Sequence, residues 1–73
     1  MRMNMNQKRR QVIRIAMSAA DINKIRLAKA LDLSYPTMLK KLKSPDKFKI
    51  GQAERLCDLL NIDLREFVNP LNN

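Results

Sequence analysis

Residues 22–42 read INKIRLAKALDLSYPTMLKKL, and no other part of the sequence says as much about the fold. It opens near Asn23, a residue type whose side-chain oxygen accepts a hydrogen bond from an unpaired backbone N–H at a helix start. Apolar residues then recur at helical spacing up to Leu31. After a break at residues 32–34, a second periodic run continues to Lys43. The stretch therefore predicts two helices joined by a short turn.

Four residues of this stretch fit the needs of two crossing helices. Helices that cross at about 90–120° need a small residue where they meet, and Ala28 is expected there. The turn needs a residue that tolerates a left-handed backbone, and Asp32 is one of the few non-glycine types that do. We expect Leu33 to fill the corner and Met38 to pack the second helix against the first.

Pro36 marks the start of the second helix. A proline suits the first helical position, because the N–H that it lacks would be unbonded there anyway. It also biases Tyr35 away from helical dihedral angles, so either Ser34 or Tyr35 is the N-cap. Met38 and Leu42 then form an apolar stripe at i, i+4.

The segment before this unit predicts one further helix. Residues 1–6 are polar and rich in methionine, and we expect them to form a flexible start of the chain. From Gln7 onward the spacing is helical. One face carries the apolar residues Val12, Ile13, Ala16 and Met17, and the basic residues lie mostly on the other: Lys8, Arg9, Arg10 and Arg14.

Two more helices are predicted after the unit. Residues 44–46 end the second helix, and a basic loop follows at 47–49. Near-heptad spacing predicts the fourth helix, with this apolar stripe: Ile50, Ala53, Leu56, Cys57 and Leu60. Asn61 ends it. Asp63 and Glu66 are spaced like a capping box for a short fifth helix, which Asn69 and Pro70 end.

Length and composition agree with one helical domain. The chain has 73 residues, 45% of them hydrophobic, with a single glycine and many Leu, Ile, Lys, Arg and Ala residues. Such a mixture favours helices over strands. We therefore predict an all-α, five-helix domain over residues 1–73, with the two crossing helices at 23–43 and helices four and five at 50–68.

The charge is concentrated in one part of the chain. Residues 1–49 carry 13 basic and three acidic residues, whereas residues 50–73 carry two basic and four acidic ones. A charged surface that only confers solubility usually mixes both signs. This distribution, with a net charge of +8, therefore indicates a polyanionic partner such as nucleic acid. The run 8–10 is interpreted either as a groove-reaching arm or as a solvated helix start.

Several classes of function lack the residues that they need. With no histidine and a single cysteine, the chain has neither an intrachain disulfide nor a common zinc-ligand set. We expect no metal, no cofactor and no catalytic residue, and we interpret Cys57 as a small core residue. No apolar run reaches the roughly 20 residues of a membrane span. The start MRMNMNQKRR lacks the apolar segment of a secretory signal, and the cysteine count favours the reducing cytoplasm.

The stretch 22–42 resembles the phage repressor/Cro-like family of helix-turn-helix proteins, often called XRE-type. The resemblance is carried by Leu27-Ala28, Leu31, Leu33-Ser34, Thr37-Met38 and Leu42. The later segment KIGQAERLCDLLNIDLREFV, residues 49–68, is similar to the fourth and fifth helices of that family. The resemblance covers about residues 10 to 68 and implies a lambda-repressor-like fold.

The chain departs from the family pattern at a few positions. The family usually has Gln where Lys24 stands, Gly where Asp32 stands and an apolar residue where Lys41 stands. It often has a Glu-x-Gly exit where residues 42–44 stand here. Because Lys41 is not apolar, Leu39 is an alternative to Met38 as the core position of the second helix.

The resemblance implies that the second helix enters the major groove of DNA with its N-terminal residues at base edges. Four residues occupy the outward positions that the family uses for base reading: Tyr35, Pro36, Thr37 and Lys40. Lys40 is suited to donate to guanine O6 and N7. Six further residues are expected at phosphates: Lys24, Ser34, Lys41, Lys43, Lys47 and Lys49.

Several of these residues also suit roles that involve no contact with DNA. Lys40, Lys41 and Lys43 would also suit a solvated helix face, and Tyr35 would also pack its ring on the domain surface. Pro36 serves helix initiation at least as well as base contact.

The implied partner is double-stranded DNA, bound by a homodimer on a palindromic site with half-sites about 34 Å apart. We expect the fifth helix and the segment 70–71 to form the dimer surface, and the protein to act as a small repressor of the phage or mobile-element type. The alternative is an antitoxin-like protein-interaction module on the same fold, with contacts supplied by Leu39, Leu59, Phe48 or the methionine-rich start. RNA binding is disfavoured by the scarcity of aromatic residues for base stacking.

Overall fold

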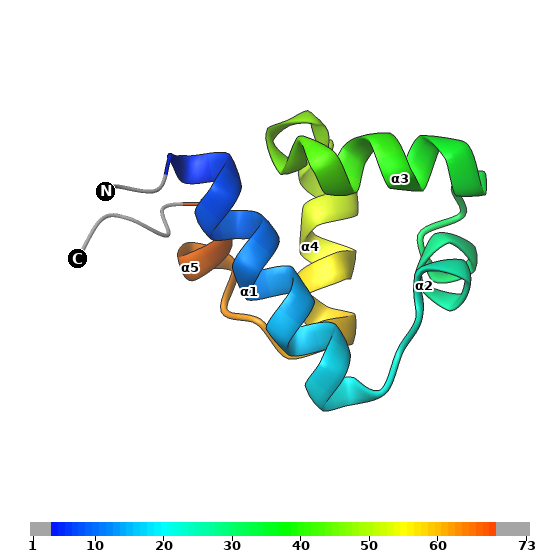
Figure 1. Ribbon diagram of the computed structural model, residues 1–73, viewed down its shortest axis with the longest axis horizontal. Coiled ribbons are helices and arrows are strands. Elements are labelled where there is room, and N and C mark those ends of the chain that lie inside the picture. The colour runs from blue at the N-terminus through cyan, green and yellow to red at the C-terminus, as the bar shows by residue number, and fades with distance from the viewer. Residues whose placement is uncertain (1–3, 69–73) are drawn as a thin grey trace.

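The computed structural model describes residues 4–68, and within them every regular element is a helix. The order along the chain is α1 (Met5–Ala20), α2 (Lys24–Ala30), α3 (Tyr35–Lys43), a short 3₁₀ turn η1 (Pro45–Lys47), α4 (Ile50–Leu60) and α5 (Leu64–Val68). The predicted five-helix, all-α fold is confirmed. Figure 1 shows α1 along one side of the domain, α3 across the top and α4 behind them, with α2 on the opposite side from α1.

The first helix starts earlier than the sequence spacing predicted. Asn4 is its N-cap: the Asn4 side chain accepts a hydrogen bond from Gln7 N, and the Gln7 side chain accepts one from Asn4 N. The Asn6 side chain also donates to Asp46 at 2.8 Å. The prediction of a flexible start is therefore corrected for residues 4–6, because a capping box and this long-range contact order them. Residues 1–3 lie outside the described residues.

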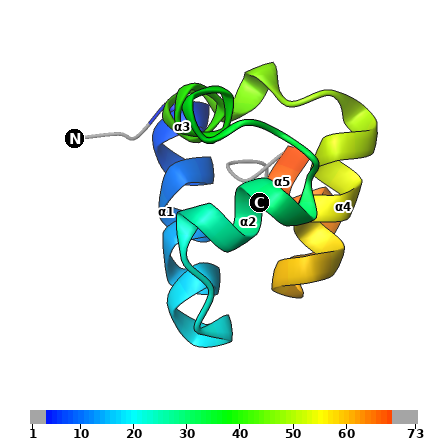
Figure 2. The same ribbon diagram turned by 90° about the vertical axis from the view of Figure 1, so that its right-hand side faces the viewer.

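The two crossing helices have the geometry that the sequence predicted. Asn23 caps α2 by accepting a hydrogen bond from Arg26 N. Ser34, and not Tyr35, caps α3, and Pro36 lies in its first turn. Ala28 is buried between the helices. Figure 2 shows α3 end-on above α2, so the two helices cross steeply.

Three helices end in the same left-handed turn. Asp21 and Asn61, which directly follow α1 and α4, have φ values of 54° and 56°. Asp32, which follows the C-cap Leu31 of α2, has a φ of 57°. After α2, Leu33 N donates to Ala28 O and Asp32 N donates to Lys29 O, the hydrogen-bond pattern of a Schellman motif. Aspartate and asparagine thus replace the glycine that usually occupies this position.

The core lies between the four longer helices. Its buried residues are Ile13, Leu27, Ala28, Leu31, Met38, Phe48, Ala53, Leu56, Cys57, Leu60 and Phe67. Met38 is fully buried, whereas Leu39 is only half-buried, which settles the register of α3. Phe48 packs edge-to-face on Phe67 with ring centroids 6.2 Å apart. The prediction that Phe48 could serve a partner protein is therefore wrong, because its ring lies inside the domain.

Other local predictions need correction. Ile50, predicted in the apolar stripe of α4, is 67% exposed, because it lies in the first turn, outside the core cluster. Asp63 accepts a hydrogen bond from Arg65 N at the start of α5, so the predicted pairing with Glu66 is replaced by one with Arg65. The predicted helix end at residues 69–70 and the expected dimer segment 70–71 lie outside the described residues. No helix among residues 4–68 is long and apolar enough to cross a membrane.

Candidate nucleic-acid interface

The N-terminal turn of α3 presents its polar groups to solvent. The Ser34 hydroxyl donates to Thr37 Oγ1 at 2.8 Å, and Thr37 N donates back to Ser34 Oγ at 3.3 Å. This reciprocal pair fixes both side chains beside the exposed Tyr35 and Pro36. Tyr35 is 43% exposed, so its ring is only partly packed on the domain.

The outward face of α3 brings the four predicted base-reading residues together. Because Met38 faces the core, Pro36 and Lys40 point to the opposite side of the helix, at i and i+4. Thr37 lies beside them at the helix start, and Tyr35 precedes Pro36. Pro36 and Lys40 therefore share the outward face of α3, with the exposed Tyr35 and the half-buried Thr37 on either side of them at the helix start.

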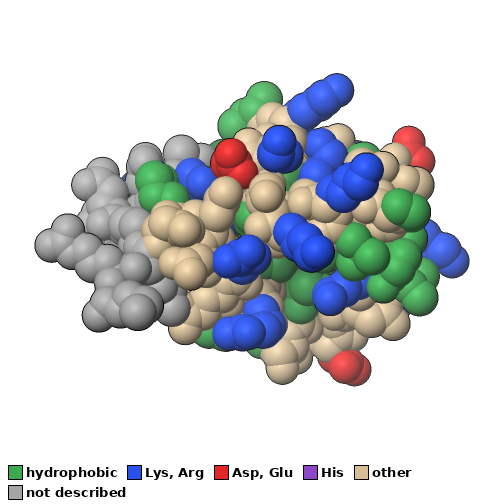
Figure 3. Space-filling view, turned by 45° about the horizontal axis from the view of Figure 1, so that its top comes forward, with side chains coloured by type: hydrophobic (Ala, Val, Ile, Leu, Met, Phe, Trp, Pro, Cys, Tyr) green, Lys and Arg blue, Asp and Glu red, His purple; other side chains and the backbone are tan. Residues whose placement is uncertain are grey.

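Basic side chains are frequent on the same face of the domain (Figure 3). Figure 3 shows the domain with the top of Figure 1 brought forward, and Lys and Arg side chains clearly outnumber acidic ones on this face. Lys24 lies at the first position of α2 and Lys43 at the last position of α3. Lys47 and Lys49 follow in the segment between α3 and α4, and all four are exposed.

Lys41 differs from the other predicted phosphate ligands. It is half-buried, its amine donates to Lys47 O at 3.0 Å, and that amine lies 6.0 Å from the centre of the Phe48 ring. These contacts stabilise the turn after α3 by a hydrogen bond and a cation–π interaction. Lys41 therefore has a structural role where the family usually has an apolar residue, a role that the sequence interpretation missed.

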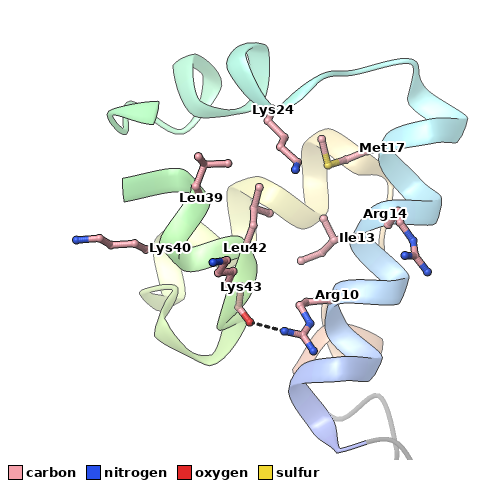
Figure 4. A pocket seen from close by; sticks show the side chains of 9 residues that line it. All are labelled: Arg10, Ile13, Arg14, Met17, Lys24, Leu39, Lys40, Leu42 and Lys43. Atoms are coloured by element: carbon pink, nitrogen blue, oxygen red, sulfur yellow. Dashed lines mark hydrogen bonds between the residues drawn. The ribbon is translucent and has the colours of Figure 1, made fainter. Parts of the chain in front are cut away.

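A groove of about 550 Å³ lies between α1 and α3 and is closed at one end by α2. Its apolar lining consists of Ile13, Met17, Leu39 and Leu42. Five basic residues complete the lining: Arg10, Arg14, Lys24, Lys40 and Lys43. Figure 4 shows Ile13, Met17 and Leu42 converging on the centre of this groove, with the Lys24 amine pointing down between α1 and α3.

Three arginine side chains donate hydrogen bonds to backbone carbonyls near the ends of other helices. Arg10 donates to Lys43 O at the end of α3, Arg55 donates to Ala30 O at the end of α2, and Arg9 donates to Phe67 O in α5. The Arg9 guanidinium also lies 5.9 Å from the centre of the Phe67 ring. The 8–10 run is therefore part of α1, and two of its three residues bind other helices. In the sequence, only the helical spacing of Arg9 and Arg10 from Ile13 and Met17 indicated that these two side chains could face other helices.

The pKa shifts of Cys57 and Asp63 arise from contacts within the fold. Burial and the neighbouring Asp63 raise the pKa of the Cys57 thiol to about 11, so the group stays protonated at neutral pH. Hydrogen bonds from Arg65 lower the pKa of Asp63. Among residues 4–68, no three His, Cys, Asp or Glu side chains come together as a metal site would require.

A steep pair of short helices, a capped second helix with an exposed outward face and a surrounding basic surface define a helix-turn-helix domain of the kind that binds DNA. Residues 12–70 match the family of the Cro/C1-type HTH DNA-binding domain, and the chain belongs to that family. No curated protein matches the chain significantly, and no solved structure does. DNA binding follows from the family.

Proposed function

We propose that this domain is a transcriptional repressor that binds double-stranded DNA sequence-specifically through α3. The observation that carries the proposal is the single exposed surface shared by the start of α3 and its surrounding lysines. A helix of this width fits the major groove, where each base pair presents its own pattern of donors and acceptors. The start of α3 is the part that would reach the base edges.

Lys40 is the residue to which we assign most of the base reading. It is exposed on the outward face, and no hydrogen bond within the described residues occupies its amine. A lysine amine in the major groove donates to guanine O6 and N7. Pro36 and Tyr35 would make apolar contacts with thymine methyl groups, and the Thr37 hydroxyl would donate to a base or to a phosphate.

The phosphate contacts would come from both ends of the helix-turn-helix. Lys24 lies at the N-terminus of α2, where the helix dipole adds to the attraction of its amine for phosphate. Lys43, Lys47 and Lys49 would follow the backbone on the other side of α3. Ser34 lies between the two groups, but its hydroxyl donates to Thr37 Oγ1, so Ser34 is left out of this set. Such contacts position the domain without reading sequence. Lys41 is left out of this set, because its amine is bound within the domain.

We further propose that two copies bind a palindromic site, as small regulators from phages and mobile elements do. A single module of this size buries limited area on DNA, and a second copy one helical turn away adds affinity and specificity. The exposed part of α5 is our proposed dimer surface.

The test is selection of preferred duplexes from a random pool, followed by fluorescence anisotropy in a salt titration. We expect a preferred sequence with two half-sites, and a steep fall of affinity with salt, set by about four lysine–phosphate contacts for each bound copy. Binding that is salt-dependent but indifferent to sequence would contradict the proposed base reading. An absence of binding at low salt would contradict the whole proposal.

A further inference from the structure

We propose that the groove between α1 and α3 is a docking site for a short, acidic, amphipathic helix of a partner protein. The groove is lined by four apolar and five basic side chains and by no carboxylate. Binding of the partner helix in the groove depends only on the fold and not on the proposed DNA binding. The consequence for DNA binding, given below, rests on the proposed function.

The floor of the groove is apolar although the groove is open to solvent. Ile13 is almost fully buried beneath it, and Met17, Leu39 and Leu42 are half-buried along its walls. An apolar floor offers nothing to a phosphate backbone, which is recognised by charges and N–H groups. Apolar side chains of a partner would gain from burial here.

The rim of the groove carries only positive charge. Figure 4 shows Arg10 and Lys24 at opposite ends of the groove, while Lys40 and Arg14 extend outward from α3 and α1. Arg10 donates one of its N–H groups to Lys43 O. Because a guanidinium has five donors, the others remain available to a carboxylate of the partner. The partner is therefore expected to carry glutamate or aspartate on both sides of an apolar stripe.

The dimensions of the groove favour a helix as the occupant. On α1 the lining residues run from Arg10 to Met17, a distance of about 10 Å at 1.5 Å per residue, or two helical turns. The α1 residues of the lining recur at i, i+3, i+4 and i+7, and on α3 Leu39, Leu42 and Lys43 recur at i, i+3 and i+4. A third helix laid between these two would present apolar residues at i, i+3, i+4 and i+7, as helix-in-groove ligands do. A small molecule would be less well covered, because small-molecule sites bury most of the ligand surface.

The groove shares residues with the proposed DNA surface. Lys24, Lys40 and Lys43 line the groove, and the same lysines are assigned to base or phosphate contacts above. Because one lysine cannot bind both a carboxylate and a phosphate fully, the acidic helix and DNA would exclude each other. The partner would thus act as an inhibitor of DNA binding.

The experiment uses the full chain labelled with ¹³C in its methionine methyl groups. The probe is a synthetic helical peptide of about 15 residues, with leucines at i, i+3, i+4 and i+7 flanked by glutamates. A scrambled peptide of the same composition is its control. We expect the probe to shift the Met17 methyl signal, which reports on the groove, in a saturable way, with little effect on the core residue Met38.

Three protein variants make the result specific. Leu39→Glu is expected to weaken the probe at least about tenfold, because it places a like charge on the apolar wall. Ile15→Glu adds the same charge at a residue of α1 that is 61% exposed and outside the groove, and it is expected to change the affinity less than about twofold. Lys24→Glu, an exposed change, is expected to weaken the glutamate-flanked probe and to favour a lysine-flanked version of it.

Three outcomes would overturn the proposal. They are equal binding of the scrambled peptide, equal binding by Leu39→Glu, and no Met17 shift at about 1 mM probe, where a complex with a millimolar dissociation constant is half formed. Displacement of a fluorescent duplex by the probe then tests the mutual exclusion. A protein that binds the probe but no DNA would contradict the proposed function and leave the groove proposal standing.

Discussion

The Arg10 guanidinium donates a hydrogen bond of 3.1 Å to the carbonyl oxygen of Lys43, the last residue of α3. The two residues are 33 positions apart in sequence. The bond satisfies one of the carbonyls that a helix leaves unpaired at its C-terminus, and the positive charge lies at the negative end of the helix dipole. It therefore holds the far end of the candidate recognition helix against α1, while Ser34 caps its near end.

Arg10→Ala is expected to lower the free energy of unfolding by about 1 kcal/mol, because one charge-assisted hydrogen bond between α1 and α3 is lost on an exposed surface. For a domain of this size that corresponds to a fall in Tm of about 4–8 °C. Thermal unfolding by circular dichroism measures it. Arg14→Ala, one turn further along α1, is the matched control and is expected to change the stability by less than about 0.5 kcal/mol. Equal losses in the two variants would contradict the role of the bond.

Met38→Ala tests the register of α3. Met38 is fully buried, and its truncation is expected to cost about 2–5 kcal/mol, enough to unfold much of so small a domain. Leu39→Ala, at a half-buried neighbour, is expected to cost distinctly less. Urea unfolding compares the two variants. A larger loss for Leu39→Ala would mean that α3 presents its other face to the core.

Asp32 tests the left-handed turn between α2 and α3. Its φ is 57°, a conformation that glycine adopts without cost and that alanine adopts at a cost of about 1–2 kcal/mol. The free energy of unfolding of Asp32→Gly is therefore expected to equal or exceed that of the parent, with an uncertainty of about 0.5 kcal/mol. That of Asp32→Ala is expected to be about 1 kcal/mol lower than that of the parent. Thermal unfolding measures both. An alanine variant as stable as the glycine variant would show that the turn is not left-handed in solution.

The Cys57 thiol gives the stability a pH dependence in the alkaline range. Its pKa is raised by burial to about 11 from an ordinary 9.0, so the unfolded chain ionises first as the pH rises. The contribution of the protonated thiol to stability is thus fully present below pH 9.0 and is lost progressively up to about pH 11. Urea unfolding of the parent and of Cys57→Ala at several pH values isolates this effect, because all other titrating groups are common to both. Parallel pH profiles for the two proteins would contradict it.

Much of the fold could be predicted from local signals. The caps Asn23 and Ser34, the helix-initiating Pro36 and the left-handed Asp32 each act within four residues of their own position. The 3.6-residue periodicity showed most of the buried residues of α1 and α4, but it wrongly included Ile50. These are interactions between sequence neighbours, so a sequence alone contains them. The family resemblance then placed the outward face of α3.

What the sequence did not show depends on contacts between distant segments. Asn6 is ordered by Asp46, Arg9 binds the carbonyl of Phe67, and Lys41 is drawn to the carbonyl of Lys47 and the ring of Phe48. In the sequence, each of these three polar residues is expected to be a solvated group on the surface. Only the packing of the helices decides which charges face solvent and which close a helix end. The groove between α1 and α3 likewise exists only once both helices are in place.

The proposed role of Lys40 in reading a base is tested most directly by a double-mutant cycle on the selected duplex. The four affinities are those of the parent and of Lys40→Ala, each for the preferred duplex and for one with the contacted guanine pair replaced. The parent is expected to lose about 1–3 kcal/mol on base replacement, and Lys40→Ala almost none. Lys29→Ala, an exposed lysine of α2 outside the proposed surface, is the control and keeps the full preference. If Lys40→Ala binds more weakly but keeps the same preference at every base pair, Lys40 contacts only phosphate and does not read a base.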